Sequence, residues 1–188
     1  VTTIPGGIIT AITSGIILPL LVKTPEETLP TFTDFFFTFF IGSIIADFGQ
    51  YWGHRIMHEN VWLYQNVHSV HHQIDTPSVV STAYVHPLDC FLQVSLPSMA
   101  TVFLTSMHPV TMFAFIFCRV MENSFDHCGV NHPIINIICL KFLPFRASIQ
   151  HHDEHHRYSS YVGKGKNYGE GFYIWDLIFG SMRKTTSR

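Results

Sequence analysis

Four apolar stretches, separated by polar segments, dominate the chain. They lie near residues 4–22, 35–53, 89–107 and 109–125. The first has no charged residue, although glycines and prolines interrupt it, and the second carries Asp47 as its single charge. A helix needs about 20 predominantly apolar residues to cross the hydrocarbon core of a bilayer. The pattern therefore predicts about four membrane-spanning helices.

The third and fourth stretches form one apolar region that a turn divides. No Asp, Glu, Lys or Arg occurs between Cys90 and Cys118, and the pair His108-Pro109 interrupts this run. Because proline removes a helical donor and disfavours helix in the residue before it, we expect two helices that meet in a tight turn there. The four spans then form two hairpins, which brings both histidine-rich polar segments to the same side of the membrane.

The distribution of charge along the chain indicates which side of the membrane the histidine-rich segments face. Most of the 11 Lys and Arg residues lie from Lys141 onward, whereas the linker at 23–34 is acidic. Positive charge is enriched in cytoplasmic segments, so the histidine-rich side is expected in the cytosol. The predicted fold is an all-α integral membrane helical bundle with a cytosolic, histidine-rich helical cap. We expect one domain over 1–188, in the endoplasmic reticulum membrane of a eukaryote or the inner membrane of a bacterium.

Composition narrows the class of protein. Of the 188 residues 47% are hydrophobic and only 13% are charged, about half the charged share of an ordinary soluble domain. A net charge of -2 gives no electrostatic footprint for a nucleic-acid partner. The four cysteines form no CxxC pair, which argues against a disulfide framework. The 13 histidines, as many as Asp and Glu together, are the candidate chemistry.

Eight histidines fall in three short groups. His54 and His58 form an HxxxH pair, and HxxHH occurs at 68–72 and again at 152–156. Chance gives about 0.06 copies of HxxHH in a chain of this composition. On a helix, positions i, i+3 and i+4 share one face, so each group is expected to present its imidazoles in one direction. These groups predict a metal site with two ions, whereas a lone histidine such as His108 is expected to cap a helix or lie at the membrane interface.

Carboxylates near these groups are candidates for supporting roles. Asp47, Tyr51, His54 and His58 fall within one face of a helix, so Asp47 is expected to point toward the metal and orient a ligating ring. The alternative for Asp47 is a solvated charge at the end of the helix. Asp126 beside His127, and Asp153 within the third group, allow the same supporting role.

In their order along the chain these motifs resemble the membrane-bound fatty acid hydroxylase and sterol desaturase family. The resemblance covers about 40–183 and rests on the histidine groups, on Tyr84-Val-His86-Pro87, on Asp126-His127-Cys128-Gly129, and on Asn167-Tyr168-Gly169 with Trp175-Asp176. It implies a helical membrane domain with a histidine-bound di-iron centre that uses molecular oxygen. The implied metal ligands are His54, His58, His68, His71, His72, His127, His152, His155 and His156.

Other histidines receive weaker roles from the same resemblance. His86 matches the family's His-Pro turn, for which a supporting role that faces the site is expected. His132 has no fixed role, because many relatives lack a histidine there, and for His151 a neighbouring supporting or solvent-exposed role is expected.

The implied activity is hydroxylation or desaturation of a membrane lipid by an oxidoreductase with two iron ions and O2 as co-substrate. A sterol is slightly favoured over a fatty acyl chain or a sphingoid base. The resemblance also implies a separate electron donor, a reduced b-type cytochrome or a ferredoxin. A basic C-terminal side could dock an acidic donor, and a positive membrane flank explains the same charges; its residues include Lys164, Lys166, Arg183 and Lys184.

Two other classes of function stay open at this stage. Two metal ions that lower the pKa of bound water would serve a zinc-dependent membrane hydrolase, which would not consume oxygen. A metal-binding or haem-binding membrane protein is the second class, and haem would give a Soret band. The motifs HExxH, GxSxG and GxGxxG do not occur in the chain. The sequence starts at Val1, and we treat it as an excerpt from which nothing about targeting follows.

Overall fold

The computed structural model describes residues 8, 12–21, 28–74, 77–159 and 165–183. Within these residues every regular element is a helix, and pairing between extended segments is limited to one isolated bridge between Arg146 and Phe172. The all-α prediction is therefore confirmed. The elements are η1 (Thr13–Ile17), α2 (Leu18–Leu21), α3 (Phe32–Glu59), α4 (Val61–Asn66), η2 (His68–Gln73), η3 (Val79–Ala83), α5 (Pro87–Cys90), η4 (Phe91–Ser95), α6 (Leu96–Thr105), α7 (Pro109–Asp126), α8 (Pro133–Ile138), α9 (Ile149–Tyr158) and α10 (Ile174–Ile178).

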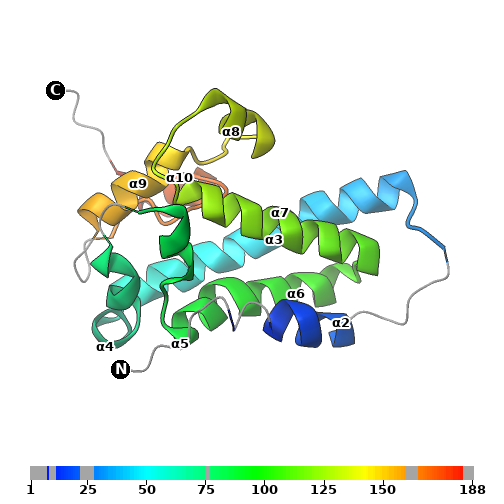
Figure 1. Cartoon of the computed structure of the whole chain (residues 1–188), viewed down its shortest axis with the longest axis horizontal. Coiled ribbons are helices and arrows are strands. Elements are labelled where there is room, and N and C mark those ends of the chain that lie inside the picture. Colours follow the sequence, from blue (N-terminus) through cyan, green and yellow to red (C-terminus); the bar gives the residue numbers. More distant parts are fainter. Residues whose placement is uncertain (1–7, 9–11, 22–27, 75–76, 160–164, 184–188) are drawn as a thin grey trace.

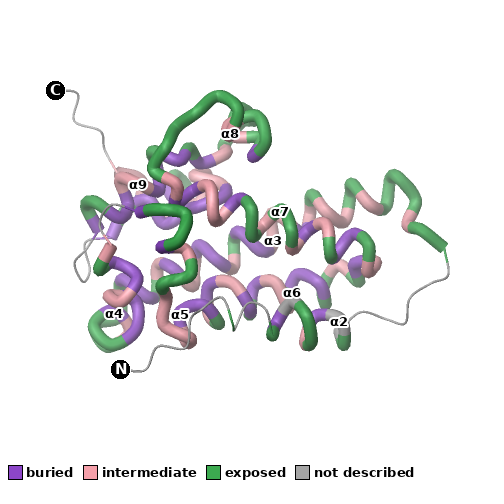
Figure 2. The backbone as a smooth tube through the Cα atoms, viewed as in Figure 1, coloured by how far each residue is buried: buried purple, intermediate pink, exposed green. Residues whose placement is uncertain are grey.

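Three long helices, α3, α6 and α7, run side by side along the long axis of the molecule (Figure 1). At one end of this bundle α4, η2, α9 and α10 gather into a cap. Buried residues concentrate in the cap and on the inward faces of the long helices, whereas the opposite end of the bundle is largely exposed (Figure 2). The site described below lies where the bundle meets the cap.

Helix α3 connects the two parts. It starts after Thr31, whose side chain accepts the N–H of Asp34 at 3.1 Å, and it ends at Asn60, whose side chain caps α4 through the N–H of Leu63 at 3.0 Å. Threonine and asparagine at these positions satisfy helix donors that would otherwise lack partners. The helix is longer than the predicted span at 35–53, so the HxxxH pair lies on the same continuous helix as the apolar stretch.

Small residues allow α3 to approach its neighbours closely. A Cβ at Gly49 would lie 3.0 Å from a side-chain atom of Pro97, and one at Gly53 would lie 2.8 Å from the carbonyl oxygen of Leu92. Apolar side chains fill the bundle beyond this contact: the core consists of Leu18, Ala46, Val102, Met107, Met112 and Phe115. The packing fixes the position of α3 against η4 and α6, and with it the position of the histidines at its end.

The predicted turn between the third and fourth apolar stretches is present. Helix α6 ends at Thr105, Ser106 takes a left-handed conformation with φ 48°, and α7 begins at Pro109. His108 caps α7, because its Nδ1 accepts the N–H of Val110 at 3.1 Å. His108 thus has the capping role expected of a lone histidine.

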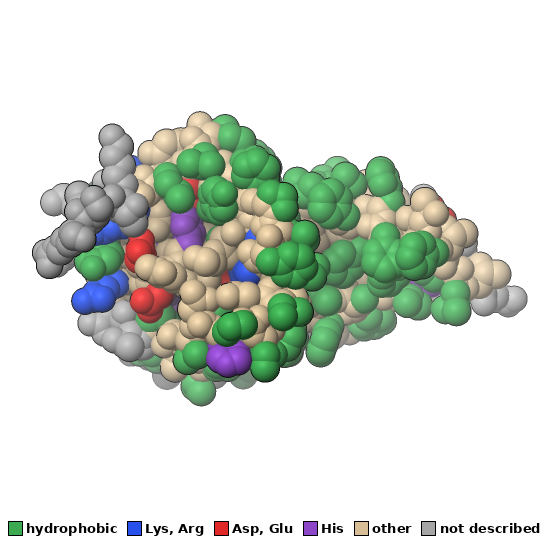
Figure 3. Space-filling model, turned by 90° about the horizontal axis from the view of Figure 1, so that it is seen from above, with side chains coloured by type: hydrophobic (Ala, Val, Ile, Leu, Met, Phe, Trp, Pro, Cys, Tyr) green, Lys and Arg blue, Asp and Glu red, His purple; other side chains and the backbone are tan. Residues whose placement is uncertain are grey.

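Within the part of the chain that the structure describes, two helical stretches are long and apolar enough to cross a membrane: Phe32–Glu59 and Pro87–Thr105. Most of the apolar window in the first is not buried, and its exposed side chains include Phe36, Phe37 and Phe40. Figure 3 shows apolar side chains over the narrow half of the molecule and most of the visible charged ones on the wide half. These features are those of helices that face lipid rather than a protein core.

The other two predicted spans differ from these. Much of the stretch at 4–22 lies outside the described residues, and its described part forms η1 and α2. The stretch at 109–125 coincides with α7, which carries Arg119, Glu122 and Asp126. The number of spans, and the assignment of the whole chain to one domain, stay predictions.

Candidate metal centre

Nine histidine side chains converge at the junction of bundle and cap. They form two groups, and within each group the ligand nitrogens lie within 4.8 Å of one another. The five-histidine cluster consists of His54, His58, His68, His72 and His155, and the four-histidine cluster of His71, His127, His152 and His156. The nine residues are those predicted as metal ligands from the sequence, and every one of them is buried.

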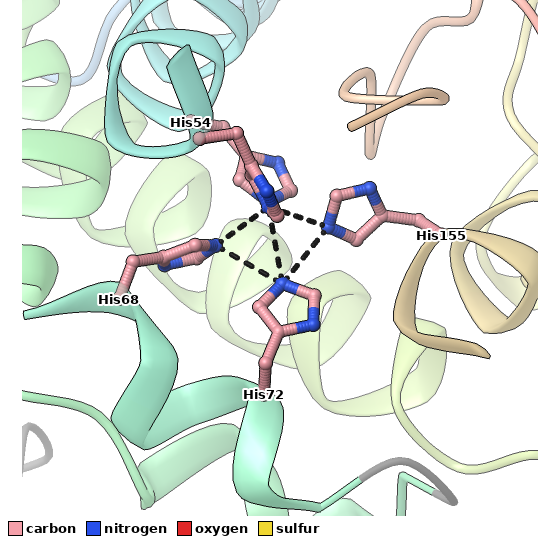
Figure 4. Close-up of side chains that lie close together, drawn as sticks. His54, His68, His72 and His155 are labelled. Carbon is pink, nitrogen blue, oxygen red and sulfur yellow. Dashed lines mark hydrogen bonds between the residues drawn. The ribbon is translucent and has the colours of Figure 1, made fainter. Parts of the chain in front are cut away.

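The Nε2 atoms of the five-histidine cluster face a common centre. The Nε2 of His58 lies 2.9 Å from that of His68 and 3.1 Å from those of His72 and His155. The Nε2 of His72 lies 3.1 Å from that of His68 and 3.2 Å from that of His155. Figure 4 shows rings from α3, η2 and α9 that point toward one another across this centre.

The four-histidine cluster repeats this geometry. The Nε2 of His127 lies 3.2 Å from that of His71 and 3.0 Å from that of His152, and the Nε2 atoms of His152 and His156 are 3.1 Å apart. Its members come from η2, from the C-terminal end of α7 and from α9. His127 matters most for the arrangement, because it joins α7 to the cap.

Each HxxHH motif divides its histidines between the two clusters. His68 and His72 belong to the five-histidine cluster, whereas His71 belongs to the other; His155 belongs to the first, whereas His152 and His156 belong to the second. The expectation that each motif presents all its imidazoles in one direction was therefore wrong. The first motif is a 3-10 helix rather than an α-helix, so its side chains spread differently around the axis. Both motifs thus link the two clusters.

The outward nitrogens of four rings are held by oxygen acceptors. The Nδ1 of His68 lies 2.7 Å from Oδ2 of Asp89. The other three acceptors are backbone carbonyls: Tyr168 for His54 at 3.0 Å, Lys166 for His155 at 2.7 Å and Asn123 for His127 at 2.8 Å. An oxygen acceptor requires the proton on Nδ1, so the Nε2 of each of these rings directs a lone pair into its cluster.

Six of the clustered histidines have a lowered pKa, which favours their neutral form at neutral pH. Burial and then neighbouring histidines lower the pKa of His71, His72, His152, His155 and His156 well below 6.5. Burial also lowers the pKa of His127 to about 4. A neutral imidazole with its proton on Nδ1 is the form that binds a metal ion.

The two clusters fit metal ions better than they fit hydrogen bonds. Five close Nε2–Nε2 contacts join His58, His68, His72 and His155. The Nε2 atoms of His68 and His155 carry no proton, so only those of His58 and His72 could donate. At most two of the five contacts can therefore be hydrogen bonds. Two nitrogens that bind one ion at about 2.1 Å lie about 3.0 Å apart when they form a right angle at the ion. The contacts of 2.9 to 3.2 Å match this separation. All donors are imidazoles, which suits iron, zinc, copper or nickel.

A turn after α9 holds two of these acceptor carbonyls. Asp176 accepts the N–H groups of Tyr168 and Gly169, both at 2.8 Å, and the hydroxyl of Ser181 at 2.7 Å. His151 lies 3.1 Å from the same carboxylate. His151 thus contacts the carboxylate that holds this turn, and its supporting role stays a prediction. Asp176 keeps the carbonyl groups of the turn over His54 and His155.

Asp47 supports the site by a different route from the predicted one. It lies on the predicted face of α3 with Tyr51, His54 and His58, and all four are buried. Its carboxylate, however, accepts the N–H groups of Gly171 at 2.9 Å and Phe172 at 3.0 Å and the indole N–H of Trp175 at 2.9 Å. Asp47 thus anchors the C-terminal segment to α3, and it contacts no histidine among the described residues.

The remaining candidates lie away from both clusters. His86 caps α5 through the N–H of Leu88, and His132 is an exposed cap of α8. Asp126 pairs with Lys141 at 2.7 Å, and Asp153 is half-buried on α9. The prediction that His86, Asp126 or Asp153 orients a ligating ring is not supported by any contact among the described residues.

Sequence reasoning missed Asp89, the carboxylate that contacts a clustered histidine. The signal was its position: Asp89 follows the His86-Pro87 turn and is the last charge before the long uncharged run. Burial raises the pKa of a second overlooked acid, Glu170, to about 8, and neighbouring Asp126 adds to the shift. Glu170 directly follows the Asn167-Tyr168-Gly169 motif, but no spacing rule singled it out.

A cavity of about 440 Å³ lies beside the four-histidine cluster. His71 and His127 contribute to its wall, whereas no member of the five-histidine cluster does so. Most of the wall's exposed surface is apolar, with aliphatic side chains contributed by α3, α6, α7 and η3. Its volume is in the range of sites for small organic ligands. One cluster therefore faces a space that a ligand can occupy.

Two buried histidine clusters at the end of a helical bundle define a candidate metal centre, and comparison with known sequences identifies the family. The profile of the fatty acid hydroxylase family matches residues 39–181. The chain therefore belongs to the fatty acid hydroxylase family. The recognition made from the motifs is confirmed.

Individual relatives point to two kinds of lipid chemistry. The chain is 39% identical over 138 residues to methylsterol monooxygenase 2-2 of Arabidopsis thaliana, covering 73% of this chain and 49% of the relative. It is 37% identical over 145 residues to very-long-chain aldehyde decarbonylase GL1-8 of Oryza sativa subsp. indica, covering 76% and 52%. The chain thus spans about half the length of the curated relatives it matches. No solved structure matches it significantly.

Proposed function

We propose that the protein is an O2-dependent oxidoreductase that binds two iron ions and hydroxylates or desaturates a membrane lipid, with a sterol favoured as substrate. The observation that carries this proposal is the convergence of nine buried histidines in two clusters, one of which adjoins an apolar cavity. The fatty acid hydroxylase family and the sterol relatives support the same chemistry.

Each of the two clusters would bind one metal ion. His54, His58, His68, His72 and His155 would hold one ion, and His71, His127, His152 and His156 the other. Iron supplies the oxidising power toward an unactivated carbon–hydrogen bond, which acid–base side chains lack. The lower number of histidines in the second cluster, together with its position on the cavity, leaves that side open to substrate.

The chain itself positions the reactants and excludes water. Asp89 and the carbonyl groups of Tyr168, Lys166 and Asn123 fix ring orientation through Nδ1. The aliphatic wall of the cavity holds the lipid, and burial of the histidines keeps bulk water from the site. Such positioning restricts oxidation to the carbon that the cavity presents.

The substrate and the electrons come from outside the described site. The lipid enters from the bilayer, and a separate reduced b-type cytochrome or ferredoxin supplies electrons on the cytosolic side. Two of the basic residues expected at a docking surface lie in the described region: Lys166 bonds the carbonyl group of Gly180 at 3.3 Å, and the Arg183 guanidinium lies 3.6 Å from the centre of the Tyr158 ring. The others, Lys164 and Lys184, lie outside the described residues.

The test is metal content followed by product analysis. Iron and zinc per chain are measured in protein purified in mild detergent without oxygen, beside the exposed-histidine control His132→Asn. About two irons per chain are expected in both. The iron-loaded protein is then given reductant, O2 and either a methylsterol or a very-long-chain aldehyde, with mass spectrometry of the products. Zinc that persists when iron is supplied, or lipid loss without O2 consumption, would indicate hydrolysis instead.

A further inference from the structure

Polar and apolar residues share the wall of the cavity beside the four-histidine cluster, and most of the polar side chains already have partners within the protein. Gln50 accepts a hydrogen bond from Arg119, and Gln93 donates one to Asp89. Arg119 also pairs with Glu122 at 3.0 Å. These groups are therefore committed to the protein rather than to a ligand.

Glu170 is the exception among the charged groups of the wall. Its side chain lines the cavity, and the residue is only 8% exposed. Among the described residues, the basic nitrogen that its carboxyl approaches is Nδ1 of His54, which at 3.9 Å is too far away for a hydrogen bond. That nitrogen donates instead to the carbonyl oxygen of Tyr168 at 3.0 Å. A buried carboxyl without a hydrogen bond is costly, because it has lost its contacts with water. A ligand in the cavity would remove that cost.

Neighbouring contacts hold Glu170 in place. The N–H of Gly169 is bound by Asp176 at 2.8 Å, and the N–H of Gly171 is bound by Asp47 at 2.9 Å. The carbonyl oxygen of Glu170 itself lies 3.5 Å from Nζ of Lys141. Residues on both sides of Glu170 are thus fixed to different elements, so its backbone is held in place before any ligand arrives, which lowers the entropic cost of binding.

The charges around Glu170 select the chemistry of the ligand. The cations Arg119, Lys141 and Arg146 already pair with Asp47, Glu122 and Asp126. No unpaired cation among the described residues of the wall remains for a lipid carboxylate, and Glu170 would repel one. A hydroxyl group, by contrast, donates to a carboxylate and accepts from a carboxylic acid, so it suits Glu170 in either protonation state.

We infer that Glu170 binds the hydroxyl group of a neutral lipid alcohol, and that the aliphatic wall of the cavity holds the rest of that molecule. Lining residues such as Ala46, Val79, Val94 and Pro97 provide smooth apolar contact for a bulky hydrocarbon body. A sterol fits this description, whereas a free fatty acid does not. The inference rests on the proposed function, which it deepens by naming the substrate's polar group and the residue that recognises it.

The experiment compares two sterols that differ in one group. A radiolabelled methylsterol with a 3-hydroxyl and its 3-deoxy analogue are bound at equilibrium to iron-loaded protein in detergent, without O2 or reductant, so that no turnover occurs. Wild type is expected to bind the alcohol about tenfold more tightly than the deoxy compound. Glu170→Ala should reduce this ratio to about one while the deoxy sterol still binds as in wild type, and Glu170→Gln should retain part of the preference.

A second polar group in the cavity wall serves as the control for Glu170. The Thr82 hydroxyl lines the cavity, is buried and has no hydrogen-bond partner among the described residues. Thr82→Val keeps the shape of the side chain and is expected to keep the preference for the alcohol. A preference retained by Glu170→Ala, or lost in Thr82→Val instead, would overturn the inference. If the wild-type protein binds both sterols equally, the inference about Glu170 is overturned but the proposed sterol substrate is not. If it binds neither sterol, the proposed sterol substrate is contradicted as well.

Discussion

The two histidine clusters use the same side chain in different surroundings. In the five-histidine cluster, His54, His68 and His155 are oriented through Nδ1 by Tyr168, Asp89 and Lys166, and no member lines the cavity. In the four-histidine cluster, the oxygen acceptor is the Asn123 carbonyl on His127, and two members line the cavity. One cluster is closed and firmly supported, whereas the other is open to a ligand.

This difference separates holding a metal from using it. Closed sites with a full set of ligands stabilise a fold, and sites with an open position bind substrate. Because α9 contributes His155 to one cluster and His152 and His156 to the other, the two ions would share one helix. The open site can therefore keep a free position without losing its geometry.

The largest expected effect comes from removing one ligand from either cluster. His155→Ala and His156→Ala alter adjacent residues of α9, one from each cluster. Each variant is expected to lose about one of the two irons, and activity should fall by more than about 100-fold because a ligand affects the centre more than its supporting residues do. Metal analysis and turnover check this. An active His155→Ala variant with two irons contradicts the ligand assignment.

Loss of a supporting carboxylate should have a smaller effect, confined to the closed cluster. Asp89→Asn keeps the shape of the side chain but weakens its hold on His68, and metal affinity should fall by about 10- to 100-fold. Competition with a chelator measures this for each ion. Asp153→Asn is the matched control, since Asp153 lies between metal-site residues in sequence but contacts no clustered histidine among the described residues. Equal losses in the two variants would refute the role of Asp89.

The pH dependence of stability tests a member of the four-histidine cluster, which is the cluster open to a ligand. His127 has a pKa of about 4 in the folded protein, below the ordinary 6.5, because it is buried. Between these values the unfolded chain binds a proton that the folded protein does not, so stability falls as the pH decreases from about 6.5 to about 4. Thermal unfolding of the metal-free protein at several pH values measures this. In His127→Gln, the free energy of unfolding should depend less steeply on pH, by the equivalent of about one proton. An unchanged slope would contradict the assignment of this proton to His127.

The smallest effect is expected outside both clusters. His132→Asn replaces one exposed helix cap with another at the start of α8, so stability should change by less than about 0.5 kcal/mol and metal content should not change. Thermal unfolding and metal analysis test this. A loss of iron in this variant would place His132 in the site despite its distance from the clusters.

The sequence predicted the site better than it predicted the supports. Residue spacing and the family motifs identified all nine clustered histidines, because three dense groups of a rare residue are informative by themselves. The acceptors are different in kind: three are backbone carbonyls, which no residue type marks, and Asp89 is distant from His68 in sequence. The division of each HxxHH motif between clusters depends on packing and on a 3-10 helix, which the sequence pattern did not reveal.

The helical pattern was likewise predictable only in part. The apolar runs gave the helices and the His108-Pro109 turn, since hydrophobicity and proline act locally. The partners of Asp47 were not predictable, because the helix face it occupies points both to the histidines and to the C-terminal segment at 171–175. Tertiary packing chose between the two.

The clusters also constrain the order in which the protein can be completed. His54 is synthesised well before His155, yet both belong to the same cluster. An ion held by both would act as a reversible cross-link that closes the long intervening loop, and it would stabilise the fold by restricting the unfolded chain. A cluster that draws on both ends of this loop is complete only after His155 has been made, so an ion could be held by the full set of ligands only from that point on.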